Sequence, residues 1–523
     1  MIGGIVHLAR NIRAGFVLAR EGALALIDPS VLPPAGRAVL RAARLIEKRR
    51  VGDGAARLSA ALTRLGPSYV KFGQFLATRP DLVGVAAARD LESLQDRMPP
   101  FPRADAVRMV ELALGRPLDA MFTEFSEPVA AASIAQVHKA RIRTAEGEEV
   151  VAVKVVRPGV REEFARDLQA MRFAARLIER LVPDARRLRA QEVVETLARS
   201  VAIEMDLRLE AAAVSELAEN TKDDPDFRVP RLNWDLTARD VLTTEWIDAI
   251  RLSDLEAIDA AGHDRVALAR TVIQSFLRHA IRDGFFHADM HPGNLFVDAQ
   301  GRLVAVDFGI MGRLGLKERR FLAEILLGFI RRDYRRVAEV HFEAGYVPPH
   351  HSVEDFAQAI RAIGEPIHDR RADEISMAKL LTLLFEITAL FDMKTRTELV
   401  MLQKTMVVVE GVARNLDPRL DMWSTSDPVV REWMERNLGP VGRLESAGRG
   451  VWTLAGVIGD LPELALRAER VLTHLEQVTA KGLPLHPDSV AAIGRAEAHG
   501  NRWGMIALWM IAALLILSWL TEL

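Results

Sequence analysis

The chain of 523 residues contains no cysteine, and this absence excludes several classes of chemistry. Without thiols there can be no disulfides, no thiolate metal sites, no cysteine-ligated iron–sulfur clusters and no thiol nucleophile. The net charge of −2 shows no excess of either sign, so nothing in the bulk charge points to nucleic acid as a partner. The composition, with 49% hydrophobic and 27% charged residues, is that of a globular protein long enough for two or three domains.

The N-terminal segment lacks the features of a secretory signal. Arginines and Glu21 interrupt its apolar residues, and no clear small-residue cleavage site follows. Read as a helix, the segment is amphipathic, with Ile5, Leu8, Ile12 and Phe16 at helical spacing. We expect a helix that packs on its own domain, with a helix lying on a membrane surface as the alternative.

The other end of the chain carries a long apolar run. Residues 503–520 (WGMIALWMIAALLILSWL) have no charge, and as a helix they would extend roughly 27 Å, enough to cross the core of a bilayer. Trp503 and Trp519 lie near the two ends, where indole rings favour the membrane interface. Arg502 precedes the run and only Glu522 follows it, so we expect a single-pass anchor with the preceding chain in the cytoplasm. A buried helix of a soluble domain is the alternative.

Two neighbouring segments carry the strongest chemical signal. FFHADMHPGNLFV (285–297) is followed by LVAVDFGIMG (303–312). They place Asp289, Asn294 and Asp307 in the order and spacing of a phosphotransferase site. Mg²⁺ prefers hard oxygen ligands, so we predict that Asn294 and Asp307 are metal ligands. Asp289 would lie beside the attacking hydroxyl or water as a base or orienting group. Either segment alone could be an ordinary polar turn beside a strand.

A lysine upstream supplies the positive charge that such a site needs. Lys154 ends the β-branched run VAVK (151–154), which is typical of a strand, and would neutralise the α- and β-phosphates of a nucleotide. The acid-rich segment AIEMDLRLEAA (202–212) follows, and on a helix Asp206 and Glu210 share one face. We predict that Glu210 is the ion-pair partner of Lys154. An exposed strand edge and a solvated helix face are the structural alternatives.

The segment before that lysine lacks the glycines of a typical protein-kinase phosphate loop. Its place is taken by PVAAASIAQVH (128–138), with alanines where glycines are expected. Alanine disfavours the positive φ that glycine allows, so we expect the loop to hold phosphates in a different way. The predicted ATP-binding residues of this loop are Ala130, Ala131, Ala132, Ser133, Ile134, Ala135, Gln136 and Val137.

The order of elements predicts an α+β, bilobal protein-kinase-like fold. The predicted domains are an N-terminal helical extension (1–115), an N-lobe with a sheet (116–247), a helical C-lobe (248–435), a helical tail (436–500) and the apolar anchor (503–520). The strand DVLTTEWI (240–247) would be the hinge between the lobes, and Glu245 and Ile247 would offer backbone groups to adenine.

Local patterns predict the elements that carry these residues. Residues 130–144 and 148–156 are predicted strands joined by a turn. A helical run is expected over about 161–220, broken near Pro183, and another over 253–284. No internal repeat or low-complexity tract is visible.

Four short motifs occur in a fixed order along the chain. They are a KxGQ motif within SYVKFGQFLATRPDL (68–82) with Lys71, Gly73 and Gln74, the alanine-rich AAAS (130–133), an ExD motif with Glu204 and Asp206, and HADMHPGN followed by DFG. Together they resemble the UbiB family of atypical kinase-like proteins, the bacterial relatives of the mitochondrial ADCK and COQ proteins linked to coenzyme Q synthesis. The resemblance runs from roughly residue 30 to 430, and the C-terminal anchor also matches bacterial members.

The resemblance carries expectations about the site and its use. It implies that the KxGQ helices fold over the cleft where a protein kinase would admit a peptide, with Lys71 and Gln74 near Glu204, Asp206 and the γ-phosphate. It also implies an ATP- and Mg²⁺-dependent atypical kinase or ATPase that supports ubiquinone biosynthesis at the bacterial inner membrane. The implied partners are membrane lipid, prenyl-phenol or quinone intermediates and other ubiquinone-biosynthesis proteins. Nucleic acid is not expected, and the sequence leaves open whether the chain forms a homodimer.

Two other functions stay open at this point. Similar HxDxxPxN loops occur in antibiotic and choline kinases, so a small-molecule or lipid kinase is one alternative. A nucleotide-binding scaffold for a biosynthetic complex is the second. A hydroxylase is rejected because the chain has no dinucleotide fingerprint, no haem thiolate and no convincing iron triad. Pro292 disfavours a helix that would bring His287 and His291 together, and we predict that His291 braces the catalytic loop.

Overall fold

The computed structural model describes most of the first four-fifths of the chain. The described segments are residues 2–23, 57–77, 98–181, 189–366 and 397–438, with a few further positions between them that include 390–393. The chain divides into two compact units, Met1–Met434 and Glu435–Leu523. Of the second unit only the first residues are described, so most of the predicted tail (436–500) and all of the predicted anchor (503–520) lie outside the described residues. Within the described residues, no helix is both long and apolar enough to cross a bilayer.

Helices make up the described N-terminal region, as the sequence predicts. They are α1 (Ile2–Arg20), α3 (Arg57–Leu65), α4 (Pro67–Ala77), α7 (Arg103–Leu114) and the short α8 (Leu118–Met121). α3 and α4 pack closely because Gly73 has no side chain. A Cβ at this position would lie 2.6 Å from Leu62 and 2.4 Å from Leu94.

The first helix packs on its own domain through its polar residues. Arg10 forms a 2.6 Å ion pair with Asp167, and Asn11 donates a hydrogen bond to the carbonyl oxygen of Ala170. Both partners lie on α9 (Val160–Leu181). Ile12 and Phe16, which the pattern would place on the packed face, are instead exposed. The helix is as expected, but this part of its apolar stripe faces outward.

The main sheet has four antiparallel strands. They are β1 (Glu124–Ala131), β2 (Ala135–Thr144), β3 (Gly147–Val156) and β5 (Val241–Glu245), in the order β1-β2-β3-β5. The predicted strands correspond to β2, β3 and β5, whereas β1 was not predicted. Its pairing with β2 shifts register on either side of Pro128. The sequence of β1 therefore lacks the regular alternation of buried and exposed residues by which a strand is predicted.

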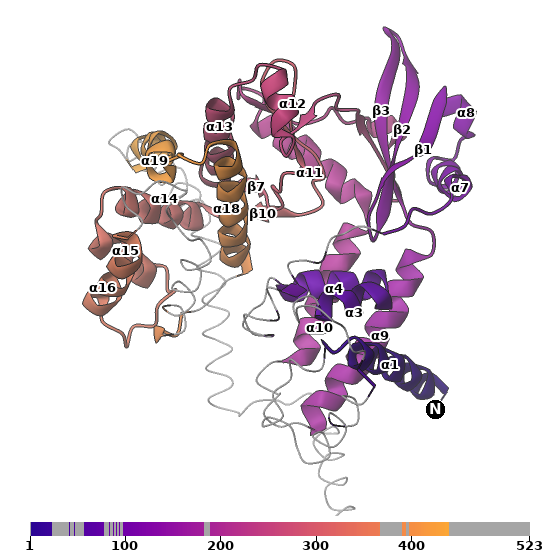
Figure 1. The fold of residues 1–523 in the computed structure, drawn as a ribbon, viewed down its shortest axis with the longest axis horizontal. Coiled ribbons are helices and arrows are strands. Elements are labelled where there is room, and N and C mark those ends of the chain that lie inside the picture. Colours follow the sequence, from indigo (N-terminus) through magenta and orange to yellow (C-terminus); the bar gives the residue numbers. More distant parts are fainter. Residues whose placement is uncertain are drawn as a thin grey trace, which may run out of the picture. The chain divides into compact units, whose positions relative to one another are not determined.

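One face of this sheet forms a core with α7, which lies against it in Figure 1. Ala106 and Val110 of the helix are fully buried there, together with Val153 and Val155 of β3. Because successive residues of a strand point to opposite faces, Lys154 between these valines points away from this core. The sheet thereby presents the lysine on the face that carries the site.

Three helices follow the sheet where one interrupted run was predicted. They are α9, α10 (Ala190–Glu204) and α11 (Leu207–Asn220). The interruption between α10 and α11 falls within the ExD motif, and the carboxylate of Asp206 accepts a hydrogen bond from the amide of Arg208 as the N-cap of α11. The expectation that Asp206 lies inside a helix is therefore wrong. Aspartate is a strong N-cap, and this preference ends the helical pattern here.

The region from 250 to 313 combines helices with short strands. Its elements are β6 (Ile250–Arg251), α12 (Leu255–Ala260), α13 (Arg265–Leu277), a π-helical turn (Arg278–Asp283), β7 (Phe285–His287), β8 (Leu295–Val297), β9 (Leu303–Ala305) and β10 (Met311–Arg313). β4 (Phe227–Arg228), β9, β8 and β6 form one small sheet, and β10 pairs with β7. The predicted helix over 253–284 is split at Gly262, where φ is +76°.

Further helices complete the described chain: α14 (Leu316–Ile330), α15 (Tyr334–Glu343), α16 (Val353–Gly364), α18 (Thr397–Leu416) and α19 (Met422–Leu438). α15 and α16 share a core with the segment around Ile387 and Phe391. Tyr334 and Phe356 are fully buried in it. The helix-rich C-terminal half agrees with the sequence prediction.

Candidate functional site

Lys154 lies at the centre of the candidate site. Its Nζ atom donates hydrogen bonds to both carboxylate oxygens of Glu210, at 2.8 and 2.9 Å, and to Oδ1 of Asp307 at 2.8 Å. These three residues come from β3, α11 and the loop after β9, so one ammonium group joins three separate parts of the fold. The predicted ion pair between Lys154 and Glu210 is present.

The electrostatics of this cluster keep the lysine charged. Burial alone would lower the pKa of Lys154, but the carboxylates of Asp307 and Glu210 outweigh it and raise the pKa well above its ordinary value. The Lys154 ammonium in turn holds the pKa of Asp307 below its usual range, although burial acts in the opposite direction. Burial raises the pKa of Glu210, and Lys154 opposes that effect. The side chain of Glu210 is 7% exposed and that of Asp307 is 54% exposed. Asp307 is therefore the carboxylate that a ligand could reach.

The catalytic loop is held in place by its own backbone and side chains. The amide of Asp289 donates to Nδ1 of His287 at 3.0 Å, and the ring Nε2 of His287 is hydrogen-bonded to the Val306 carbonyl oxygen at 3.1 Å. Burial lowers the pKa of His287, which favours its neutral form. The Gly293 amide donates to Nδ1 of His291, so His291 braces the loop as predicted. His287 lies in β7 and His291 in the loop after it, so the two do not share a helix face.

Asn294 and Asp307 occupy neighbouring strand ends. Asn294 directly precedes β8, Asp307 follows β9, and the amide of Val306 donates to the Asn294 carbonyl oxygen at 2.9 Å. The side-chain nitrogen of Asn294 donates to the backbone oxygen of Asp289 at 3.0 Å. That bond leaves the amide oxygen as the Asn294 atom available to a cation.

This donor set fits Mg²⁺. An amide oxygen from Asn294 and an accessible carboxylate from Asp307 are hard ligands of the kind that this ion binds. Asp307 has φ of +63°, a conformation that is costly for a residue other than glycine and that is concentrated at functional sites. The backbone thus holds this carboxylate in a restricted position rather than a relaxed one.

The KxGQ and ExD motifs meet through one ion pair. Lys71 of α4 contacts the carboxylate of Glu204 at the end of α10. Lys71 also lowers the pKa of Asp307, and Glu204 raises that of Glu210, so this pair lies within electrostatic range of the Lys154 cluster. Gln74 is partly buried on the same helix as Lys71.

Asp206 has a different position from the one expected. Its carboxylate accepts hydrogen bonds from the Arg208 side chain at 2.7 and 2.9 Å, and this contact lowers the pKa of Asp206. The ExD motif therefore splits between two tasks. Glu204 faces Lys71, while Asp206 caps α11 and binds Arg208.

The alanine-rich loop is a tight turn between β1 and β2. The amide of Ala132 donates to the carbonyl oxygen of Ala135 at 2.8 Å, and Ser133 and Ile134 are buried between them. The side-chain amide of Gln136 is hydrogen-bonded to both backbone groups of Phe101. Gln136 is therefore occupied in joining the sheet to the segment before α7.

The exposed part of the loop is the part that a phosphate could approach. Ala130 is exposed, Ala131, Ala132 and Val137 are half-buried, and Ala135 is buried. Of the eight predicted ATP-binding residues, the structure thus places four at least partly at the surface. The other four, Ser133, Ile134, Ala135 and Gln136, are buried.

The hinge strand is present, with one of its predicted groups already in use. The backbone amide of Glu245 donates to the carbonyl oxygen of Arg231 at 2.8 Å, and its carboxylate binds Arg228. The N–H of Glu245 is therefore already bonded, because the chain between β4 and β5 folds back against β5, and a contact between adenine and another backbone group of Glu245 stays a prediction. Ile247 is the second residue after the end of β5 and is half-buried.

Three further residues support the site but carry no recognisable sequence signal. The Arg157 guanidinium donates to the carbonyl oxygens of Pro99 and Ala132, fastening the alanine-rich turn. Arg161 contacts the Met205 carbonyl oxygen within the ExD break. Thr405 donates to the Ala288 carbonyl oxygen at 3.0 Å, directly before Asp289. Each interaction joins residues far apart in sequence, so local patterns do not reveal it.

Comparison with known proteins agrees with the motif order. Residues 93–341 match the ABC1 atypical kinase-like domain, and residues 360–421 match the UbiB helical domain. A protein of Marinobacter nauticus described as "Probable protein kinase UbiB" is 40% identical over 485 residues, which cover 89% of this chain and 87% of that protein. A solved complex of Rv3197 with erythromycin from Mycobacterium tuberculosis is 26% identical, with a TM-score of 0.49, over 63% of this chain and 83% of the other.

Proposed function

Because this chain belongs to the UbiB family of atypical kinase-like proteins, we propose that it is a membrane-anchored, Mg²⁺-ATP-dependent ATPase or phosphotransferase that supports ubiquinone biosynthesis. One observation carries the proposal. The Lys154 ammonium is bonded to both Glu210 and Asp307, and the Lys71–Glu204 pair lies within electrostatic range of it. A nucleotide-handling site needs a fixed cation for phosphates beside an accessible carboxylate for metal.

Each residue of the site has a role that follows from its contacts. Glu210 fixes the Lys154 ammonium, which would bind phosphate oxygens. Asn294 and Asp307 would hold Mg²⁺, which when bound neutralises phosphate charge. Asp289 is held beside Asn294 and would orient or deprotonate the attacking water or hydroxyl. No covalent intermediate on the chain is required.

The acceptor side of the site favours something other than a protein substrate. The buried Lys71 and the half-buried Glu204 form an ion pair within electrostatic range of Asp307, in the region where the family resemblance places a covered peptide cleft. Water or a small lipid-derived phenol would need less space than a peptide. We propose that ATP turnover assists the transfer of prenyl-phenol intermediates out of the bilayer.

Membrane association is part of this proposal. The apolar run at 503–520 would be the anchor and would place the kinase-like domain on the cytoplasmic side of the inner membrane. The exposed Ile12 and Phe16 of α1 offer a second apolar contact for lipid. Fractionation of the full chain, compared with a variant that ends at residue 500, tests the anchor: we expect the shortened chain to leave the membrane fraction after a high-salt wash.

The catalytic proposal is tested with full-length protein in liposomes. We expect ATP hydrolysis that requires Mg²⁺ and rises when a prenyl-phenol analogue is included, with no rise for a peptide control. Asp307→Asn should lower turnover at least about a hundredfold and should fail to restore the quinone pool of a strain lacking the protein. Asp259→Asn, an exposed aspartate outside the site, is the matched control.

The outcomes separate the alternatives. Transfer of labelled γ-phosphate to a lipid or metabolite, rather than to water, would identify a lipid or small-molecule kinase. Full restoration of the quinone pool by Asp307→Asn, despite lost turnover, would identify a nucleotide-binding scaffold. Hydrolysis unaffected by Asp307→Asn would overturn the assignment of the site.

A further inference from the structure

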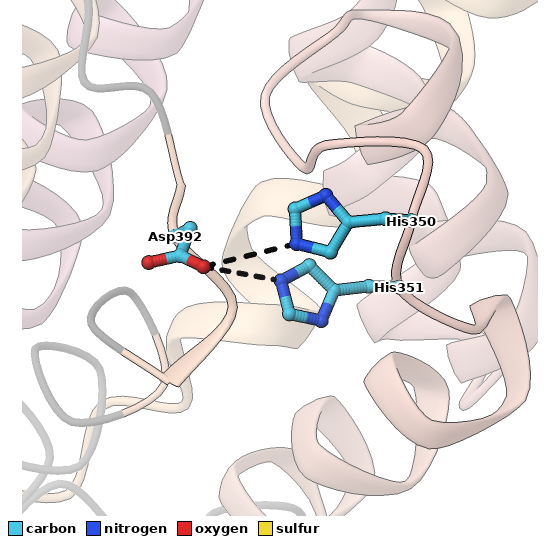
Figure 2. A group of neighbouring side chains, drawn as sticks. All are labelled: His350, His351 and Asp392. Atoms are coloured by element: carbon cyan, nitrogen blue, oxygen red, sulfur yellow. Dashed lines mark ion pairs between the residues drawn. The ribbon is translucent and has the colours of Figure 1, made fainter.

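A second cluster of potential metal ligands lies outside the site described above. His350 and His351 are adjacent in the loop between α15 and α16, and Asp392 comes from the segment before α18. Figure 2 shows both imidazole rings extending from one loop toward the carboxylate on the opposite segment. One potential ligand atom from each residue lies within 4.8 Å of the others.

The distances suit a small transition-metal ion. Nε2 of His350 and Nε2 of His351 lie 3.8 and 3.6 Å from Oδ2 of Asp392. Ligand atoms about 2.0–2.2 Å from a tetrahedral Zn²⁺ ion are roughly 3.3–3.6 Å apart, so both histidine–aspartate separations are within a few tenths of an ångström of that geometry. Direct hydrogen bonds would need shorter separations than the two observed.

The surroundings of His351 point to a ligand as well. Its Nε2 atom is buried and has no hydrogen-bond partner, although a buried polar nitrogen ordinarily has one. The centroid of the His351 ring lies 5.2 Å from that of the Phe391 ring and 4.2 Å from that of the His350 ring. Phe391 fixes one side of the His351 ring, and the free nitrogen is directed to Asp392 (Figure 2).

The chemistry of the three groups selects the class of metal. Two imidazoles with one carboxylate form a ligand set that binds Zn²⁺ and its first-row neighbours, whereas Mg²⁺ and Ca²⁺ prefer oxygen ligands alone. The chain has no cysteine, so a zinc ion could be held only through nitrogen and oxygen atoms. Three protein ligands leave a fourth position for water.

We propose that His350, His351 and Asp392 bind one divalent transition-metal ion, with Zn²⁺ the best fit, and that this ion ties two parts of the helical region together. The two histidines lie between the segments that match the kinase-like domain (93–341) and the helical domain (360–421), and Asp392 lies within the second. The ion would fasten the segment carrying Phe391 to the α15–α16 pair, whose core already includes this ring. Its role is structural, and it is separate from the Mg²⁺-ATP chemistry proposed above.

Zinc binding to the purified full chain tests the proposal. Metal-free protein is titrated with Zn²⁺ in excess Mg²⁺ against a chromophoric chelator, and bound metal is counted by mass spectrometry. We expect one high-affinity ion per chain. Loss of even an outer partner of a metal site costs about 10–100-fold in affinity, so His351→Asn and Asp392→Asn should each weaken binding at least tenfold. His263→Asn, a histidine elsewhere in the fold, should leave binding unchanged.

A spectroscopic measurement guards against misfolded variants. His350 is mostly exposed, so His350→Asn should fold normally and still weaken binding. Co²⁺ bound at the site should give visible absorption typical of a tetrahedral nitrogen–oxygen environment, and this absorption should be lost in His350→Asn. Amide exchange around Phe391 should slow when Zn²⁺ is added to the parent chain but not to the variant.

Several results would overturn the proposal. Absence of a high-affinity ion in the parent chain would show that the cluster is only a loose ion pair. Equal Zn²⁺ affinity in the parent, His350→Asn and Asp392→Asn proteins would place any bound ion elsewhere. Binding without a change in exchange around Phe391 would remove the structural role.

Discussion

Two lysines in this protein are each paired with a glutamate, yet they do different work. Lys154 lies on a strand and bonds two carboxylates from different parts of the fold, Glu210 and Asp307. Lys71 lies on a helix and forms an ion pair with Glu204. Glu210 is almost fully buried, whereas the Glu204 side chain is 25% exposed.

The difference shows that one ion pair can stabilise the fold, while another mainly positions helices beside the site. Removing Lys154 would leave a buried carboxylate without compensation, which is strongly destabilising. Removing Lys71 would leave Glu204 partly open to water, where a carboxylate is stable. Lys154 therefore belongs to both the fold and the chemistry, while Lys71 belongs chiefly to the arrangement of helices beside the cleft.

The largest expected effect comes from Lys154→Met. We expect ATP turnover to fall at least about a hundredfold, because a fixed charge aimed at phosphate is lost. The free energy of unfolding should fall by about 3 kcal/mol, because Glu210 stays buried without its partner. Turnover assays and urea unfolding measure the two effects.

The controls for this change separate stability from chemistry. Lys222→Met removes an exposed lysine and should change stability by less than about 0.5 kcal/mol. The double variant Lys154→Met with Glu210→Leu should recover part of the stability but none of the turnover. Recovery of turnover in the double variant would contradict the role of Lys154.

The next effect in size is expected for Gly73→Ala. A Cβ at Gly73 would meet Leu94 at 2.4 Å and Leu62 at 2.6 Å, so α4, which carries the KxGQ motif, would be pushed away from α3. Overpacking of this kind costs about 1–3 kcal/mol in the free energy of unfolding. Gly411→Ala in α18 is the matched control, because nothing lies within 4 Å of its added Cβ. The control should be neutral or slightly stabilising, and equal losses in both variants would refute a packing role for Gly73.

A smaller effect is expected for Lys71→Met. The free energy of unfolding should fall by about 1 kcal/mol, since Glu204 can turn toward water. Double-mutant cycles with Glu204→Gln and with Glu210→Gln give the coupling energies of the two lysine pairs. We expect the Lys154–Glu210 coupling to be the larger. A larger coupling for Lys71–Glu204 would reverse the comparison.

The smallest effect concerns pH, and it tests whether the lysine pairs are the source of acid sensitivity. Lys154 has a raised pKa, so its contribution is complete below its ordinary value of 10.5 and is lost only as pH rises through the folded-state pKa. Asp307 has a lowered pKa, so its contribution is complete above its ordinary value of 3.8 and is lost as pH falls through the folded-state pKa. The contribution of the Lys154–Asp307 pair should therefore be constant from about pH 5 to 9.

Buried histidines should give the first loss of stability on acidification. Burial lowers the pKa of His279, His287 and His341, so the unfolded chain takes up protons below about 6.5 that the folded chain refuses. Unfolding followed by circular dichroism should show stability falling from pH 6.5 to 5. His341→Gln should reduce this loss of stability, and His263→Gln, at a half-buried histidine, is the matched control. A fall unchanged in His341→Gln would assign the sensitivity to other groups.

The sequence predicts the chemical groups of the site better than the packing contacts that hold them in place. Lys154 lies within the β-branched strand β3 and Asp307 follows β9, and strand alternation with motif spacing is enough to place them together. The Lys71–Glu204 contact depends on how α4 packs beside α10, which no local pattern encodes. It was expected only from the family resemblance.

Errors occurred where a local preference overrode a regular pattern. Asp206 interrupts the helix by capping it, and Pro128 shifts the register of β1. The hydrogen bond from the Glu245 amide to the Arg231 carbonyl oxygen was not anticipated, because it joins segments that are separate in the sequence pattern. The short strands β7–β10, three residues each, gain their form from pairing with one another, so their sequences alone carry little signal.

The hydrogen bond from Thr405 to the Ala288 carbonyl oxygen has a consequence for cooperativity. Thr405 belongs to α18 in the helical domain, and Ala288 directly precedes Asp289. Both Thr405 and Ala288 are buried, so separating the two segments would break a buried hydrogen bond and leave the Ala288 carbonyl oxygen without this partner. We therefore expect the unfolding of α18 to be coupled to loosening of the catalytic loop. Hydrogen exchange at the amide of Asp289 should then report on α18, which lies more than a hundred residues later in the sequence.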